Sequence, residues 1–325
     1  MLRSIVLSAS LLVAAPFSLM AATPLGTPDP EDIEYPEGDP PSAREVALGK
    51  VLFFDTRLSG NERQSCASCH NPDLGFSDGL ANGLGANGNT LSRNAPHLYN
   101  LAWSSILMWD GRAATLEEQA AGPITAEAEM NMLSISKLIK RLKNVPYYRT
   151  EFQAVYGGIT QDGITRALAS FQRTLMSINS PFDKYMKGDK HAMSSAAIRG
   201  MELYTGKARC TLCHDGPNFT DDSFHNIGVG SGDRGRAAII NDKSLEGAFK
   251  TPGLRNALLT APYMHDGSIP TLEQVVRFYN RGGNSKENIS PLIKPLNLTD
   301  REVLDLVAFL GALTDPVIVE RPKIP

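Results

Sequence analysis

Apolar residues recur every three or four positions along most of this chain, which is the spacing of amphipathic helices. Residues 134–142 and 160–178 show this spacing, and Thr299 and Glu302 form a capping box in front of a further apolar stretch. The alternation of apolar and polar residues that marks half-buried strands is scarce. The pattern therefore predicts a mainly α-helical protein.

The chain also contains an internal repeat. Residues 96–119 read PHLYNLAWSSILMWDGRAATLEEQ, residues 252–275 read PGLRNALLTAPYMHDGSIPTLEQV, and the two align without a gap at an offset of 156 residues. In each half, a stretch with helical spacing (residues 45–54 and 197–204) precedes a motif that contains cysteine. One structural unit is thus predicted twice, and positions where the halves differ indicate different roles.

The repeat predicts two domains, residues 42–180 and 181–325, and the length is sufficient for two hydrophobic cores. Residues 1–22 have the form of an export signal, with Arg3, an apolar stretch and small residues at the end. A retained N-terminal anchor is the alternative. Residues 23–41 are rich in proline and acidic residues, which predicts an exposed leader.

Composition narrows the classes of function. The formal net charge is −3, and no basic tract suggests binding to nucleic acid. No later segment approaches about 20 uninterrupted apolar residues, so the mature chain is expected to have no membrane span. Together with the export signal, this predicts a periplasmic protein.

The cysteines carry the first chemical signal. All four belong to two C-x-x-C-H motifs, which are Cys66, Cys69 and His70 in the first half and Cys210, Cys213 and His214 in the second. In this motif both thiols bind vinyl groups of one haem c, and the histidine binds the iron. Disulfides, a zinc site or a redox dithiol are alternatives, but none requires the histidine in both copies. The motifs predict two covalent haems.

The function of each haem depends on the sixth position of its iron. A haem with two strong protein ligands relays electrons, whereas an open one can bind peroxide. The remaining histidines, the methionines and the tyrosines are the candidate ligands. Met108 and Met264 occupy matching positions of the repeat, which favours a packing role for both.

Several further motifs resemble one known family. They are RNAP at 93–96, MWDGR at 108–112, EMN at 129–131, SPFD at 180–183 and LTAPYMH at 259–265. With the C-x-x-C-H motifs, they are similar to the bacterial di-haem cytochrome c peroxidases and their MauG-like relatives, over nearly the whole mature length. The resemblance implies two cytochrome c-like domains, hydrogen peroxide as a substrate, and a protein electron donor or protein substrate as the partner.

The resemblance also implies the ligand of the second haem. In this family it stands fourteen residues after the histidine matching His265, as methionine in conventional peroxidases and tyrosine in the MauG-like branch; here it is Tyr279. The alternative is a helix residue with its hydroxyl at the surface. The repeat partner of Tyr279 is Pro123, which has no side-chain group that binds iron. A capped second haem and an open first haem are therefore expected.

Conventional peroxidases carry a capping histidine in the loop after the first haem, but residues 71–96 contain none, and Ala86 stands at that place. The loop is rich in glycine, which predicts a mobile segment. His97 lies beyond it, opposite Gly253 in the repeat, and is expected to be structural. The first haem is thus predicted to be five-coordinate without prior reduction.

The resemblance assigns three residues to the peroxide chemistry. Glu129 would move a proton between the peroxide oxygens with a pKa raised by desolvation, Gln119 would donate a hydrogen bond, and Trp109 would lie between the haems. The alternatives are a surface carboxylate, an exposed amide and a core aromatic residue.

Two binding sites complete the expectations. Asn94 and the carbonyls of Thr260 and Pro262 match the inter-domain calcium site of the family, and oxygen ligands suit that cation. Arg255 is a candidate partner of a haem propionate, with solvated surface as the alternative.

Three functions remain open at this point. The first is MauG-like oxidation of a residue on a partner protein, and the second is conventional cytochrome c peroxidase activity that removes peroxide with electrons from a small redox protein. The third is a plain di-haem electron carrier. Tyr279 favours the first, and Pro123 disfavours the third.

Overall fold

The computed structural model describes residues 24–36, 38–230, 232–284 and 287–325, so the predicted signal peptide lies outside the described residues. The predicted mainly α-helical fold is confirmed. The helices are α1 (Ala43–Phe54), α2 (Cys66–Cys69), α3 (Leu116–Thr125), α4 (Ile135–Lys143), α5 (Pro146–Tyr156), α6 (Gln161–Arg173), α7 (Pro181–Met186), α8 (Ser195–Thr205), α9 (Arg236–Ile240), α10 (Leu272–Asn280) and α11 (Asp300–Ala312). The short strands β1 (Phe224–His225) and β2 (Phe249–Lys250) pair antiparallel.

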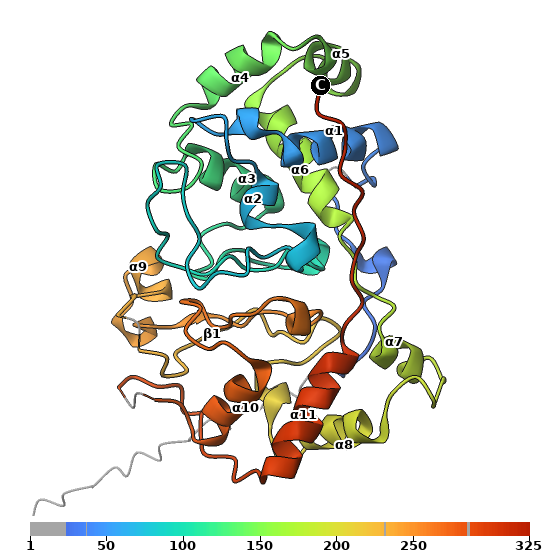
Figure 1. Ribbon diagram of the computed structural model, residues 1–325, viewed down its shortest axis with the longest axis vertical. Helices are drawn as coiled ribbons and strands as arrows, with labels where there is room; N and C mark the ends of the chain where they lie inside the picture. Colours follow the sequence, from blue (N-terminus) through green and yellow to red (C-terminus); the bar gives the residue numbers. More distant parts are fainter. Residues whose placement is uncertain (1–23, 37, 231, 285–286) are drawn as a thin grey trace, which may run out of the picture.

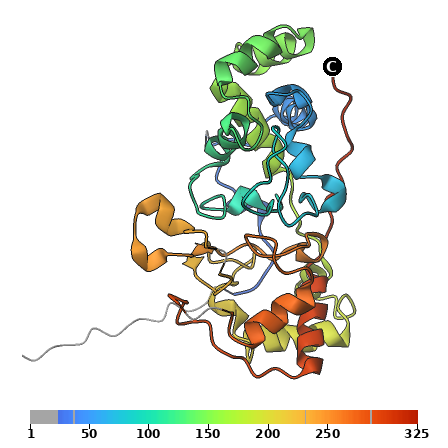
Figure 2. The ribbon, with the colours of Figure 1, turned by 60° about the vertical axis from the view of Figure 1, so that its left-hand side comes forward.

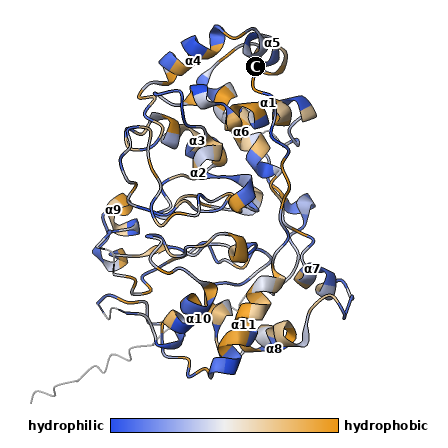
Figure 3. Cartoon of the chain, in the orientation of Figure 1, coloured by the Kyte–Doolittle hydropathy of each residue, from blue (hydrophilic) through white to orange (hydrophobic). Residues whose placement is uncertain are grey.

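The two halves of the chain form two lobes, one above the other (Figure 1), and a second view shows the same division (Figure 2). Helices α4 and α10 have apolar residues on one side and polar residues on the other (Figure 3). Within the described ranges, no helix is long and apolar enough to cross a membrane.

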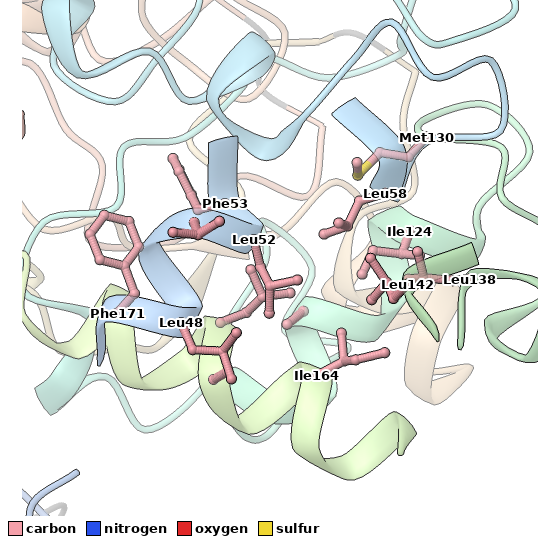
Figure 4. Packing of buried hydrophobic residues seen from close by; sticks show 14 of the residues in the cluster. Leu48, Leu52, Phe53, Leu58, Ile124, Met130, Leu138, Leu142, Ile164 and Phe171 are labelled. Atoms are coloured by element: carbon pink, nitrogen blue, oxygen red, sulfur yellow. The ribbon is translucent and has the colours of Figure 1, made fainter. Parts of the chain in front are cut away.

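The core of the first lobe lies between α1 and α6. Leu48, Leu52 and Phe171 are buried there (Figure 4), because the apolar positions of both helices face each other. The helices approach closely at Gly49, where an added Cβ atom would lie 1.7 Å from the carbonyl oxygen of Ala167. The glycine is therefore required by the helix crossing.

The second lobe repeats this arrangement with α8 and α11. Gly200 lies at the crossing, and an added Cβ atom would lie 2.0 Å from the carbonyl oxygen of Asp305. The predicted capping box is present at the start of α11, where Thr299 and Glu302 satisfy each other's backbone N–H groups. The same packing solution is thus used twice.

The backbone between the helices is also duplicated. Asn100 and Asn256 adopt the left-handed region with φ of 57° and 60°, one before each repeated turn. Thr115 and Thr271 then begin α3 and α10, each accepting a hydrogen bond from the backbone N–H three residues later. The alignment of the halves therefore holds in three dimensions.

The predicted exposed leader is partly buried. Pro28 and Ile33 are buried, the hydroxyl of Thr27 donates to Asp183, and the indole N–H of Trp103 donates to the carbonyl of Asp29. The segment stays against the protein because its few apolar residues and its carbonyl groups make contacts with both lobes. Composition alone did not reveal those partners.

The segment after α11 returns along the first lobe (Figure 1). Val317 and Val319 pack against the core of that lobe, and the guanidinium of Arg321 donates to Asp73, a few residues after the first C-x-x-C-H motif. Residues of the predicted domain 181–325 therefore cover part of the other lobe. The predicted bounds themselves remain a prediction.

Candidate active site

One continuous cavity of about 1330 Å³ lies between the lobes and reaches into both. Its walls include the residues of both C-x-x-C-H motifs. A site for one drug-sized ligand spans roughly 300–1,000 Å³, so this cavity has room for more than one large group.

The two motif histidines are oriented alike. Nδ1 of His70 lies 3.1 Å from the carbonyl oxygen of Phe76, and Nδ1 of His214 lies 3.0 Å from that of Phe219. Both phenylalanines adopt the left-handed region, which turns the carbonyl toward the ring. Because a carbonyl only accepts, Nδ1 carries the proton and Nε2 keeps its lone pair for a metal. Burial lowers the pKa of both histidines, which keeps them neutral.

The cysteines line the same cavity as thiols, and the described residues form no disulfide. Burial raises the pKa of Cys66 and Cys210 to about 12 and that of Cys69 to about 11. Paired thiols and a histidine with a free Nε2 are what covalent haem c requires. The residues of each half therefore fit one haem c.

Pro123 and Tyr279 occupy equivalent places on α3 and α10, and both line the cavity. Burial, reinforced by the nearby thiols of Cys213 and Cys210, raises the pKa of the Tyr279 phenol. None of the described residues accepts a hydrogen bond from its hydroxyl. Tyr279 is thus half-buried at the cavity wall of the second lobe, and its ligation of iron stays a prediction.

Glu129 and Gln119 both line the first half of the cavity. The side chain of Glu129 is 30% exposed, and its Oε1 lies 4.0 Å from Nη2 of Arg112. Burial raises the pKa of Glu129, and the positive charge of Arg112 opposes this. Glu129 therefore lies partly exposed at the edge of the cavity, and its role in proton transfer stays a prediction.

The glycine-rich loop after the first motif is tied to the Glu129 segment. The N–H of Ala86 donates to the carbonyl of Glu129 at 2.6 Å, and the amide of Asn61 donates to the carbonyl of Ala86. An added Cβ atom at Gly85 would lie 1.8 Å from the carbonyl oxygen of Ala128. Glycine at position 85 thus permits a close approach between two backbone segments. The prediction of a mobile loop did not include this reason for the glycine.

Trp109 lies where the two lobes meet. Its indole N–H donates to the carbonyl of Asn94 at 2.9 Å, and its own carbonyl accepts from the N–H of Lys250 in the other half. The ring lines the cavity. Trp109 therefore contacts both halves, and its place between two haems stays a prediction.

The residues of the predicted calcium site, Asn94, Thr260 and Pro262, line one cavity. Asn94 is buried, and its side-chain nitrogen donates to the carbonyl of Leu80 at 2.8 Å. This orientation leaves Oδ1 as an acceptor. Calcium binding itself stays a prediction.

Arg255 is buried rather than solvated. Its guanidinium binds both oxygens of Asp183 at 2.9 Å and donates to the carbonyls of Pro217 and Gly26. These contacts use four of its five N–H groups. At most one N–H group remains for the predicted propionate, so the main role of Arg255 in the structure is a buried ion pair.

His97 has a structural role, as predicted. Its Nδ1 accepts from the N–H of Tyr99, which leaves Nε2 to donate to the carbonyl of Gly253 at 3.0 Å. Both nitrogens are therefore used. His97 joins the two matching positions of the repeat across the interface.

Sequence reasoning missed two side-chain contacts of histidine residues. His225 lies 3.2 Å from Asp221, and that contact, together with Cys213, raises the pKa of His225 to about 10. His265 stacks on Phe249 with ring centroids 3.6 Å apart. These partners are distant in sequence or sit on irregular segments, so periodicity does not identify them.

Comparison with known proteins supports the family that the motifs indicated. A family model described as di-haem cytochrome c peroxidase matches residues 43–191. The methylamine utilization protein MauG of Methylorubrum extorquens is 46% identical over 91% of this chain and 86% of its own length. This chain belongs to the di-haem cytochrome c peroxidase and MauG family.

Both branches of the family are among its relatives. A cytochrome-c peroxidase of Pseudomonas sp. is 37% identical over 90% of this chain and 87% of its own. A crystal structure of a MauG-like protein associated with microbial copper homeostasis has a TM-score of 0.80 and 32% identity, covering 93% of this chain and 96% of the other. Family membership makes the chain a peroxide-dependent oxidoreductase with two covalent haems c and supports the predicted pair of cytochrome c-like domains.

Proposed function

We propose that this protein is a MauG-like oxidase that uses hydrogen peroxide to withdraw electrons from a residue of a partner protein. The observation that carries the proposal is the difference between Tyr279 and Pro123 at equivalent places on α10 and α3. One half offers an anionic oxygen ligand, and the other offers a side chain that cannot bind iron. Peroxide is therefore expected at the haem held by His70.

Haem iron supplies the site at which peroxide is bound and reduced. Glu129 then accepts a proton from one peroxide oxygen and returns it to the other, so that water leaves. Its partly desolvated position raises its pKa toward the range where it can do both. Gln119, on α3 in the same half of the cavity, donates a hydrogen bond that holds the peroxide in place.

Tyr279 determines the role of the second half. A phenolate is a hard, anionic donor that favours oxidised iron. Burial raises the pKa of the free phenol, but a bound cation favours its ionised form. The thiols of Cys213 and Cys210, which also raise this pKa, would be consumed by haem attachment and would no longer oppose ionisation. Trp109, which contacts both halves, provides the route between them. The second half is thereby suited to hold an oxidising equivalent for a slow partner reaction.

Three further assignments belong to this proposal. We infer a calcium ion at Asn94 and the carbonyls of Thr260 and Pro262, because these residues line one cavity between the lobes and oxygen donors suit that cation. We also infer a periplasmic location after removal of residues 1–22. The partner is a protein with an oxidisable residue.

Stoichiometric peroxide titration, followed by optical and electron paramagnetic resonance spectroscopy, tests the proposal. Tyr279→Phe should retain both haems but lose the state in which one equivalent of peroxide changes both haem signals. Glu129→Gln should retain the resting spectra and react with peroxide about 10²-fold to 10⁴-fold more slowly. Tyr185→Phe, which alters a tyrosine outside the cavity walls, is the matched control.

The results separate the candidate functions. An unchanged two-haem response in Tyr279→Phe would show that Tyr279 is not the ligand. Rapid turnover of a reduced small cytochrome by the native protein, with no oxidation stored in the second half, would assign the conventional peroxidase function instead.

A further inference from the structure

The turn that carries Trp109 is hydrogen-bonded to, and packed against, the second half of the chain. Its next residue, Asp110, is buried, and the guanidinium of Arg236 donates to the carbonyls of Asp110 and Gly111 at 3.0 and 2.6 Å. Gly111 has φ of +66°, and an added Cβ atom there would lie 2.3 Å from the ring of Phe224. The turn is therefore seated tightly against the other lobe.

A chain of charges crosses this interface. Asp233 of the second half binds Arg93 through two contacts of 2.7 and 2.9 Å. Arg93 in turn donates to the carboxylate of Asp110. Because bidentate arginine–carboxylate pairs fix geometry as well as charge, the position of Asp110 is defined from both lobes.

Arg112 extends this chain toward the cavity. Its Nη1 donates to both oxygens of Asp110 at 3.0 and 2.8 Å, which directs its Nη2 toward Oε1 of Glu129 at 4.0 Å. The side chain of Arg112 is 39% exposed, so the pair lies at the rim of the cavity and is partly screened by solvent.

We propose that Arg112 is a positioning residue that directs the Glu129 carboxylate and favours its ionised form, and that Asp110 and Asp233 hold Arg112 in place. This inference rests on the proposed function of Glu129. It adds a dependence on the second lobe, because the residues that orient Arg112 are themselves anchored by Asp233 and Arg236.

The surroundings of Glu129 make Arg112 the main charged influence on it. Cys69 faces it from α2 and is consumed in haem attachment, Glu127 lies exposed on its own segment, and Asp110 is neutralised by its arginines. Residues 83–91 of the loop above it carry no titratable side chain. Among the described residues, Arg112 therefore supplies the positive charge that counteracts burial.

Removal of the positive charge of Arg112 should shift the protonation equilibrium of Glu129 toward its neutral carboxylic acid form. A partly exposed ion pair corresponds to about a twofold to fivefold change in such an equilibrium. In Arg112→Gln, the carboxylic acid band of Glu129 should persist to higher pH than in the native protein. The acid side of the pH–rate profile with peroxide should move in the same direction.

Infrared difference spectra of the resting, haem-loaded protein at several pH values provide the readout that is independent of activity. Glu129→Gln identifies the band of Glu129. Arg112→Lys should restore most of the native behaviour because the charge is kept. Arg149→Gln on α5, outside the cavity walls, removes the same charge elsewhere and should have no effect.

The outcomes are separable. If Arg112→Gln leaves both the band and the pH profile unchanged, Arg112 does not position Glu129, although the function of Glu129 stands. If Glu129→Gln itself leaves the peroxide reaction unchanged, the proposed function fails first. Should Arg112→Gln not accumulate with haem, Asp233→Asn tests the same chain of contacts and should slow the peroxide reaction at least twofold with haem content unchanged. No slowing there would overturn the inference.

Discussion

Gly85→Ala tests whether the loop after the first haem motif sets the position of Glu129. Gly85 is buried, and an added Cβ atom would lie 1.8 Å from the carbonyl oxygen of Ala128, the residue before Glu129. Its φ is not in the left-handed region, so alanine introduces a steric conflict without backbone strain of its own. Carbon and oxygen cannot approach so closely, so the two segments must separate by more than about 1 Å.

The separation also lengthens the bond from the N–H of Ala86 to the carbonyl of Glu129, now 2.6 Å. A misplacement of about 1 Å in a catalytic group can cost about 10²-fold in rate. We therefore expect Gly85→Ala to react with peroxide roughly 10-fold to 100-fold more slowly. Stopped-flow mixing of the haem-loaded protein with peroxide measures this rate.

Asn89→Ala is the matched control, because Asn89 is an exposed residue of the same loop. It should react like the native protein. A native rate in Gly85→Ala, with haem content unchanged, would show that this contact does not position Glu129 and would refute the reasoning.

Two further predictions concern the fold. Asp183→Ala leaves the guanidinium of Arg255 buried without its carboxylate. It should therefore lower the free energy of unfolding of the holoprotein by about 3–5 kcal/mol, measured by denaturant titration. A loss under about 1 kcal/mol would mean that this ion pair contributes little to the stability of the fold. Gly200→Ala places a Cβ atom 2.0 Å from the carbonyl of Asp305 and should cost about 1–3 kcal/mol in the same titration, whereas Gly311→Ala, on α11 with its nearest neighbouring atom 3.8 Å from the added Cβ, should cost no stability. Equal losses in Gly200→Ala and Gly311→Ala would argue against a close helix crossing.

The features that could be predicted from the sequence are those carried by periodicity and by short motifs. Helical spacing identified the helices that begin at Gln161 and Asp300, and the repeat identified the equivalence of α3 and α10. The C-x-x-C-H motifs identified the residues that line the cavity in each half. These signals are local in the sequence, so they can be recognised without knowledge of the tertiary structure.

The features that were missed depend on contacts between distant segments. Arg255 was expected at a haem propionate, which stays a prediction, and its ion pair with Asp183, which joins residues 72 positions apart, was not foreseen. The leader was expected to be exposed, yet Thr27 contacts Asp183, and Val317 and Val319 return to the first core. Gly85 shows the same limit, because glycine permits both mobility and close approach, and only the neighbouring backbone distinguishes them.

The central claim is that one haem is open and the other is capped, and electron paramagnetic resonance of the fully oxidised, resting protein tests it most directly. Pro123 in the first half predicts one high-spin signal, and Tyr279 in the second half predicts one low-spin signal. Addition of one equivalent of peroxide should remove both signals together. Two low-spin signals at rest would contradict the account, because they would show that both irons are capped by the protein.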